Sequence, residues 1–231
     1  MNKIIALYIA LFVIPFIMAL IVSYLPNHLG KQWTAQASEI LNNQESTLKL
    51  IENKLNKTYA FFIIIFVILG LLQLNLLNEI PFITSASLLI FMAFMLCISA
   101  IDLKYKIIPD YLSLPLLWIG LLVNQSNVFT QAQNSVYGAA LGYAFLWSIS
   151  YIFLLTKKGD VLGGGDLKLI AAIGAWGGWQ ILPNTLTIAS LLGILHWLIL
   201  YKINKVNEQI PFAPSIALSG WFFLTYNVAY S

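Results

Sequence analysis

Apolar stretches of 12 to 21 residues recur along the whole 231-residue sequence and leave little room for charge. Hydrophobic residues make up 60% of the chain and charged residues only 9%, whereas soluble domains carry charge at about a quarter of their positions. Hydrocarbon offers no water to backbone N–H and C=O groups, and a helix satisfies these groups internally. The sequence therefore predicts an all-α integral membrane protein.

Eight of these stretches are candidate transmembrane helices. Crossing the hydrocarbon core takes about 20 helical residues, so the fourth and sixth stretches are short and would be tilted or re-entrant. The first stretch is too long for a signal peptide and has no small-residue cleavage site after it, which predicts a retained helix. We expect a polytopic membrane helix bundle of about eight transmembrane helices, at Ile4–Tyr24, Tyr59–Leu77, Ile83–Ile101, Leu112–Val123, Val136–Thr156, Leu169–Leu182, Leu186–Tyr201 and Phe212–Tyr230.

The basic residues are all lysines, and their distribution predicts a topology. If every stretch crosses once, all the lysines but Lys3 fall on one side of the membrane. The positive-inside rule makes that side cytoplasmic and puts both termini outside. The net charge of +3 is then a signal of topology, and nothing in the sequence points to nucleic acid as a partner.

One long polar segment, residues 25–58, interrupts the apolar pattern. Its apolar side chains recur at near-helical spacing, which predicts an amphipathic helix on the bilayer surface or a structured connector. We therefore expect a first transmembrane helix at 1–24, a short cytoplasmic amphipathic segment at 25–58 and a membrane-embedded domain at 59–231. Cys97 is the only cysteine, so neither an intrachain disulfide nor a zinc site of several thiolates is expected.

The four aspartates gather in two short regions of the sequence, Asp102 with Asp110 and Asp160 with Asp166. Two predicted spans separate these regions, so both lie on the cytoplasmic face. A carboxylate at the edge of hydrocarbon is costly unless paired or hydrated, which makes such residues functional candidates. Asp102 and Asp166 adjoin apolar runs directly. Asp110 follows Pro109 and is expected to start and cap a helix, and Asp160 is expected to be a solvated loop charge.

Three consecutive glycines, Gly163, Gly164 and Gly165, precede Asp166. Glycine tolerates positive φ and lets another chain approach closely, because it has no Cβ. The loop would then receive an extended peptide, or fold tightly enough to bring Asp166 towards Asp102. The alternative is a flexible turn before a helix. No strand precedes these glycines and their spacing differs from that of a P-loop or dinucleotide motif.

Two carboxylates that share a water molecule can hydrolyse a peptide bond. Because two like charges close together do not both ionise readily, one keeps its proton and polarises the carbonyl while the other activates water. Asp102 and Asp166 are the candidates for this pair. The two histidines, His28 and His196, form no serine protease pattern. An ion-coupled small transporter that uses the same carboxylates as a proton site is the alternative.

The blocks around these residues resemble those of bacterial type IV prepilin peptidases, membrane aspartic proteases of the GxGD type. The resemblance runs from about residue 80 to the C-terminus and implies that Asp102, which opens D-x5-[IL]-P-D, and Asp166, which closes GxGD, are the catalytic pair. The blocks that carry it are "AIDLKYKIIPDYLSLPLLWIGLLVN", "GAALGYAFLWSISYIFLL", "GGGDLKLIAAIGAWGGWQILP" and "PFAPSIALSGW".

The resemblance implies a function at the cytoplasmic face of the bacterial plasma membrane. Members cleave the basic leader from type IV prepilins or type II secretion pseudopilins, and this needs no cofactor. Lys168 matches the family's GxGD-x-K lysine and is expected to tune or position the site. Many members also methylate the new N-terminus with S-adenosylmethionine, an activity tied to an N-terminal domain that is reduced here to residues 25–58. A non-cleaving factor that binds pilin precursors is a further alternative.

Overall fold

The computed structural model of the chain describes residues 68, 71, 80–156, 163–202 and 211–230. The chain divides into two compact units, 1–72 and 73–231, and the helices described below belong to the second. The segment 25–58, the span Ile4–Tyr24 and Asp160 lie outside the described residues, as does nearly all of the span Tyr59–Leu77. These expectations, and the domain boundaries, stay predictions.

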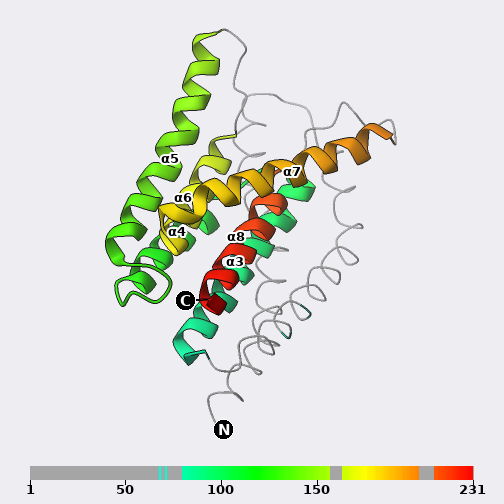
Figure 1. Ribbon diagram of the computed structural model, residues 1–231. Helices are drawn as coiled ribbons and strands as arrows, with labels where there is room; N and C mark the ends of the chain where they lie inside the picture. Colours follow the sequence, from blue (N-terminus) through cyan, green and yellow to red (C-terminus); the bar gives the residue numbers. More distant parts are fainter. Residues whose placement is uncertain (1–67, 69–70, 72–79, 157–162, 203–210, 231) are drawn as a thin grey trace, which may run out of the picture. The chain divides into compact units, whose positions relative to one another are not determined.

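Every regular element in the described part of the chain is helical, which confirms the all-α prediction (Figure 1). A short 3₁₀ turn, η2 (Trp179–Ile181), precedes the seventh helix. The α-helices are α3 (Phe82–Tyr105), α4 (Asp110–Asn124), α5 (Ala132–Leu155), α6 (Gly164–Gly177), α7 (Leu182–Lys202) and α8 (Ala213–Tyr230).

Three helical segments of the described chain are long and apolar enough to cross a membrane: Phe82–Leu103, Ala132–Leu155 and Trp179–Leu198. The apolar α4 is shorter, as expected. The predicted sixth span, Leu169–Leu182, is not one continuous helix, because α6 ends at Gly177 and the next residue, Gly178, takes φ 79°. Glycine adopts this positive φ without the steric cost that a Cβ would bring, and with ψ 175° the chain leaves the helix in an extended direction. The expected count of eight spans remains a prediction.

Helix α6 forms the interior of the described bundle. Every residue from Leu169 to Gly178 is buried, and α6 packs most extensively against α5 and α4. Helix α8 lies along α3 and also contacts α7 (Figure 1). By contrast, α5 and α7 expose many large apolar side chains, as is expected of helices that face lipid.

Helices α5 and α6 approach each other at the backbone level. A Cβ added to Gly138 would collide with the carbonyl of Gly174, and one added to Gly174 would collide with the carbonyl of Gly138. One turn further along α5, a Cβ on Gly142 would lie 3.1 Å from the carbonyl oxygen of Ile170. Small residues at such crossings let membrane helices pack at close range. This contact fixes α6 against α5.

A buried polar network holds the C-terminal end of α6. Asn124, the last residue of α4, is fully buried, and its Nδ2 donates to the carbonyl oxygens of Ala175 at 2.8 Å and Trp176 at 2.7 Å. Its Oδ1 accepts hydrogen bonds from the backbone N–H groups of Phe129 and Thr130. One side chain thus satisfies the end of α6 and the connection after α4. The other end of α6 carries Asp166.

Candidate active site

Asp102 lies in the last turn of α3, and only 6% of its surface is exposed. The backbone N–H of Ala213 donates a hydrogen bond to Asp102 Oδ2 at 3.0 Å. Ala213 is the first residue of α8, so its N–H belongs to the group at a helix N-terminus that lacks an intrahelical acceptor. A carboxylate in this place gains a charge-assisted hydrogen bond and the favourable end of the helix dipole.

The end of α3 determines where Asp102 sits. Lys106 follows the helix in the left-handed region at φ 58° and donates its N–H to the Asp102 carbonyl oxygen at 2.9 Å. This bond closes the last turn of α3. The chain then passes through Ile108 and Pro109 to the start of α4. Asp102 is therefore held at a helix end, beside the connection between α3 and α4.

The three glycines form the start of α6. Gly163 precedes the helix with φ −63°, and Gly164 and Gly165 lie in its first turn. None of the three uses positive φ, so the close approach of another segment is the property that matters. A Cβ added to Gly165 would lie 2.6 Å from the Cβ of Ile108, whereas one added to Gly164 would meet no atom within 4 Å. The α3–α4 connection therefore rests directly on Gly165.

Asp166 completes the first turn of α6, and its N–H donates to the Gly163 carbonyl oxygen at 3.0 Å. The residue is partly buried and precedes the apolar run that begins at Leu169. Burial raises the pKa of Asp166 to about 7, and the negative charge of Asp102 acts in the same direction. The structure thus brings the two aspartates, which lie on different helices, within electrostatic range of each other.

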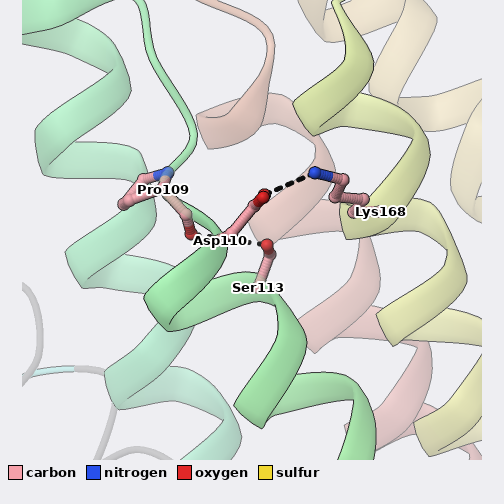
Figure 2. Close-up of polar contacts among 4 residues, drawn as sticks. All are labelled: Pro109, Asp110, Ser113 and Lys168. Atoms are coloured by element: carbon pink, nitrogen blue, oxygen red, sulfur yellow. Dashed lines mark hydrogen bonds and ion pairs between the residues drawn. The ribbon is translucent and has the colours of Figure 1, made fainter.

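An ion pair between Asp110 and Lys168 joins the start of α4 to α6 (Figure 2). Lys168 Nζ donates to Asp110 Oδ1 at 2.5 Å, and the Lys168 and Asp110 side chains are 31% and 54% exposed. Asp110 is the first residue of α4, but Pro109 occupies the N-cap position and no side-chain cap hydrogen bond forms. The expectation that Asp110 caps the helix is therefore wrong: its carboxylate reaches across to α6 instead.

Sequence reasoning missed the backbone of Ala213 as part of the site. A main-chain donor leaves no signature of its own, because every residue except proline carries an N–H. The neighbouring Pro214 is an indirect signal, since proline is favoured in the first turn of a helix, where N–H groups have no intrahelical acceptor. A helix start at this place, pointing towards a buried carboxylate, was detectable only once the fold was known.

Comparison with known proteins finds a family similarity in the central part of the chain. Residues 89–198 match the model of the type IV leader peptidase family. This matched range contains Asp102, Asp110, Asp166 and Lys168. No solved structure matches the chain.

Curated relatives carry the name prepilin leader peptidase/N-methyltransferase. The chain is 39% identical to the protein of Stutzerimonas stutzeri over 134 residues, and this aligned region covers 57% of the chain and 46% of that protein. It is 44% identical over 133 residues to the protein of Dickeya chrysanthemi, with 57% of this chain and 47% of that protein covered. The chain therefore spans about half the length of the curated relatives it matches. Residues 89–198, slightly less than half of the chain, are therefore similar to the type IV leader peptidase family.

Proposed function

We propose that this chain is a prepilin leader peptidase. It would cleave the leader of type IV prepilins or type II secretion pseudopilins at the cytoplasmic face of the plasma membrane, with Asp102 and Asp166 as the catalytic pair. The family match and the names of the relatives support this proposal. The observation that carries it is the contrast between the two carboxyls: one is held by a helix N-terminus, and the other has a pKa of about 7.

The environments of the two aspartates divide the roles between them. Burial disfavours the charge of both carboxyls, but at Asp102 the Ala213 N–H opposes this effect and favours the ionised form, because a hydrogen bond to a carboxylate stabilises its charge. Burial and the Asp102 charge favour the protonated form of Asp166 at neutral pH. Asp102 is therefore the general base and Asp166 the general acid. Two carboxyl groups that lie too close together for both to ionise form such an acid–base pair.

The reaction requires one water molecule and no covalent intermediate. Water attacks the carbonyl carbon of the scissile bond, its proton passes to Asp102, and the proton of Asp166 passes to the carbonyl oxygen. In the resulting tetrahedral intermediate the C–N bond breaks, and the leaving amine takes the proton from Asp102. A hydroxyl of the intermediate returns a proton to Asp166 as the new carboxyl forms. Both aspartates end in their starting states.

Methyl transfer is the second activity in the names of the relatives and would require S-adenosylmethionine. A pocket of about 390 Å³ opens between α7 and the start of α8, lined by Ser190, Gly193, Ile194, Trp197 and Phe212. These mostly apolar side chains do not fit the sulfonium and amino acid groups of that cofactor. No step of the proposed reaction passes through it.

Mass spectrometry of a purified prepilin incubated with the full-length protein tests the proposal. The wild-type chain should remove the leader, whereas Asp102→Asn and Asp166→Asn should each lose at least a thousandfold in rate while the protein still inserts and accumulates in membranes. A parallel incubation with S-adenosylmethionine reports methylation separately, as a gain in mass on the cleaved product. Normal cleavage by either variant would remove that aspartate from the mechanism.

The same experiment decides between the alternatives. A non-cleaving factor would bind prepilin, detectable by co-purification, and leave its mass unchanged. A transporter would show neither binding nor cleavage. The proposed cytoplasmic orientation has its own test, because Gly164 is exposed with open space around it. In a Cys97→Ala background, Gly164→Cys should react with a membrane-impermeant thiol reagent in inside-out vesicles and not in spheroplasts.

A further inference from the structure

We propose that Asp110 and Lys168 are positioning residues that clamp the first turn of α6, and with it Asp166, against the α3–α4 connection that follows Asp102. The inference rests on the proposed function for its kinetic test, and its second test is independent of activity. The clamp consists of the side-chain pair and of the contact between Gly165 and Ile108.

The glycine contact brings the two segments together. Because Gly165 has no Cβ, the Cβ of Ile108 occupies the place where a side chain would stand, 2.6 Å from the position of an added Cβ. Such a contact sets how closely α6 approaches the connection. It does not fix rotation of α6 about its own axis, since a glycine offers no side chain to hold. A second attachment is needed for that.

The ion pair supplies the second attachment. Successive helix residues are about 100° apart around the axis, so Lys168 projects from the side of α6 roughly opposite Asp166. Its Nζ reaches Asp110 Oδ1 at 2.5 Å, on the first residue of α4 (Figure 2). With Gly165 resting on Ile108 and Lys168 tied to Asp110, rotation of the first turn is restrained. The direction in which Asp166 projects is restrained with it.

Electrostatic tuning of Asp166 by Lys168 is the competing interpretation. A nearby ammonium would lower the pKa of Asp166, but this pKa is raised, by burial and by the charge of Asp102. The Lys168 charge is engaged by Asp110 instead. Positioning therefore accounts for Lys168 better than tuning, and the two make different predictions for the pH profile.

A double-mutant cycle in the full-length protein, with purified prepilin as substrate, tests the clamp. Lys168→Met, Asp110→Asn and the double variant should each lower kcat about two- to fivefold, the range expected for a partly exposed ion pair. KM should stay within twofold, and the double variant should be no worse than the singles, because the second change removes a partner that is already lost. The alkaline limb of the pH profile, the fall in cleavage rate as pH rises through the pKa of Asp166, should not move.

Two further variants serve as controls. Lys168→Arg preserves the pair and should keep at least half of the wild-type kcat. Lys202→Met removes one positive charge from an exposed residue in the last turn of α7, so it matches the change in net charge of Lys168→Met. Its kcat should equal that of the wild type. Additive losses, an unchanged kcat in both single variants, or a shifted alkaline limb would each overturn the clamp.

A substrate-binding role gives a different result. The more exposed Asp110 would then attract the basic leader, so that its removal would change KM and not kcat. The effect would also be smaller for prepilins whose leader lysines and arginines are replaced. That outcome overturns positioning and assigns the pair to recognition.

Amide hydrogen exchange, followed by mass spectrometry on the intact protein in nanodiscs without substrate, separates the clamp from the proposed function. Lys168→Met and Asp110→Asn should speed exchange at least threefold in peptides that cover residues 166–170, and Lys202→Met should not. This result is expected even if the chain proves not to cleave prepilin. Wild-type exchange rates in both pair variants would overturn the clamp even if the chain proves to be a peptidase.

Discussion

The backbone N–H of Ala213 holds the carboxylate of Asp102 at 3.0 Å across 111 positions of sequence. The contact joins the end of α3 to the start of α8, two helices that lie side by side (Figure 1). One oxygen of Asp102 is thereby committed to a fixed donor. In the proposed reaction the other oxygen accepts the proton from water, so the N–H of Ala213 orients the base as well as stabilising its charge.

Removal of this N–H should slow the reaction without unfolding the helix. Ala213→Pro deletes the donor at a helix position where proline is tolerated, and a hydrogen bond to a charged group contributes about 1.5–3 kcal/mol. We expect kcat to fall about ten- to a hundredfold. Ala213→Gly keeps the N–H and removes one methyl group, so it should retain most of the rate. Equal losses in the two variants would show that the methyl group, and not the donor, matters.

The rate of cleavage should fall as pH rises through about 7. Asp166 has a pKa of about 7 and acts as the acid in the proposed mechanism. It is therefore competent below this pH and loses its proton above it. A profile of kcat/KM against pH from 5 to 9 measures the limb in the free enzyme, which should approach a tenfold loss per pH unit above about 8. A rate that stays constant to pH 9 would contradict the assignment of Asp166 as the acid.

Asp166 should also make the stability of the protein depend on pH. Its folded pKa, about 7, lies above the ordinary value of 3.8, so between these values the folded state holds a proton that the unfolded state has released. Stability should therefore fall as pH rises from about 4 to 7. Asp166→Asn removes this penalty, which amounts to at most about 4 kcal/mol. Its Tm in detergent should exceed that of the wild type at pH 8 and match it at pH 4; an equal difference at both values would contradict the raised pKa.

The sequence predicted the helical class and both regions that carry the aspartates, because apolar runs and isolated carboxylates are local features. It missed the break at Gly178, because the apolar run resumes after this point as far as Leu182, although the Gly177–Gly178 pair is a local turn signal. It also assigned Asp110 to a cap, the local use of an aspartate after proline. The partner it has instead, Lys168, lies 58 residues away. Long-range partners of this kind depend on how the helices pack, and the order of residues in a single sequence does not reveal that packing.

The glycines before Asp166 should differ sharply in their tolerance of alanine. At Gly165 an added Cβ would lie 2.6 Å from the Cβ of Ile108, on the connection between α3 and α4, whereas at Gly164 it would meet open space. Gly165→Ala should displace the start of α6 and lower kcat at least tenfold, because small errors in the placement of catalytic groups are costly. Gly164→Ala is the matched control: it should keep full activity and gain up to about 1 kcal/mol from better helix propensity. Similar kinetics for the two variants would contradict the close contact.

Asn124 should matter for stability and not for the chemical step, because its contacts lie at the end of α6 away from Asp166. Asn124→Ala leaves three backbone groups, in Trp176, Phe129 and Thr130, without their side-chain partner, whereas the Ala175 carbonyl keeps the hydroxyl of Ser135 as a donor. Buried groups without partners cost about 1–3 kcal/mol each, and partial compensation by neighbours makes a total loss of about 2–5 kcal/mol reasonable.

The measurement is a thermal unfolding curve in detergent together with kcat at 20 °C, where the variant is still folded. Tm should fall by several degrees and kcat should stay within twofold of the wild type. Gln125→Ala changes the exposed neighbouring side chain and should leave both quantities unchanged. A variant of Asn124 with wild-type Tm and reduced kcat would mean that the C-terminal end of α6 acts on Asp166, contrary to the separation of roles between the two ends of this helix.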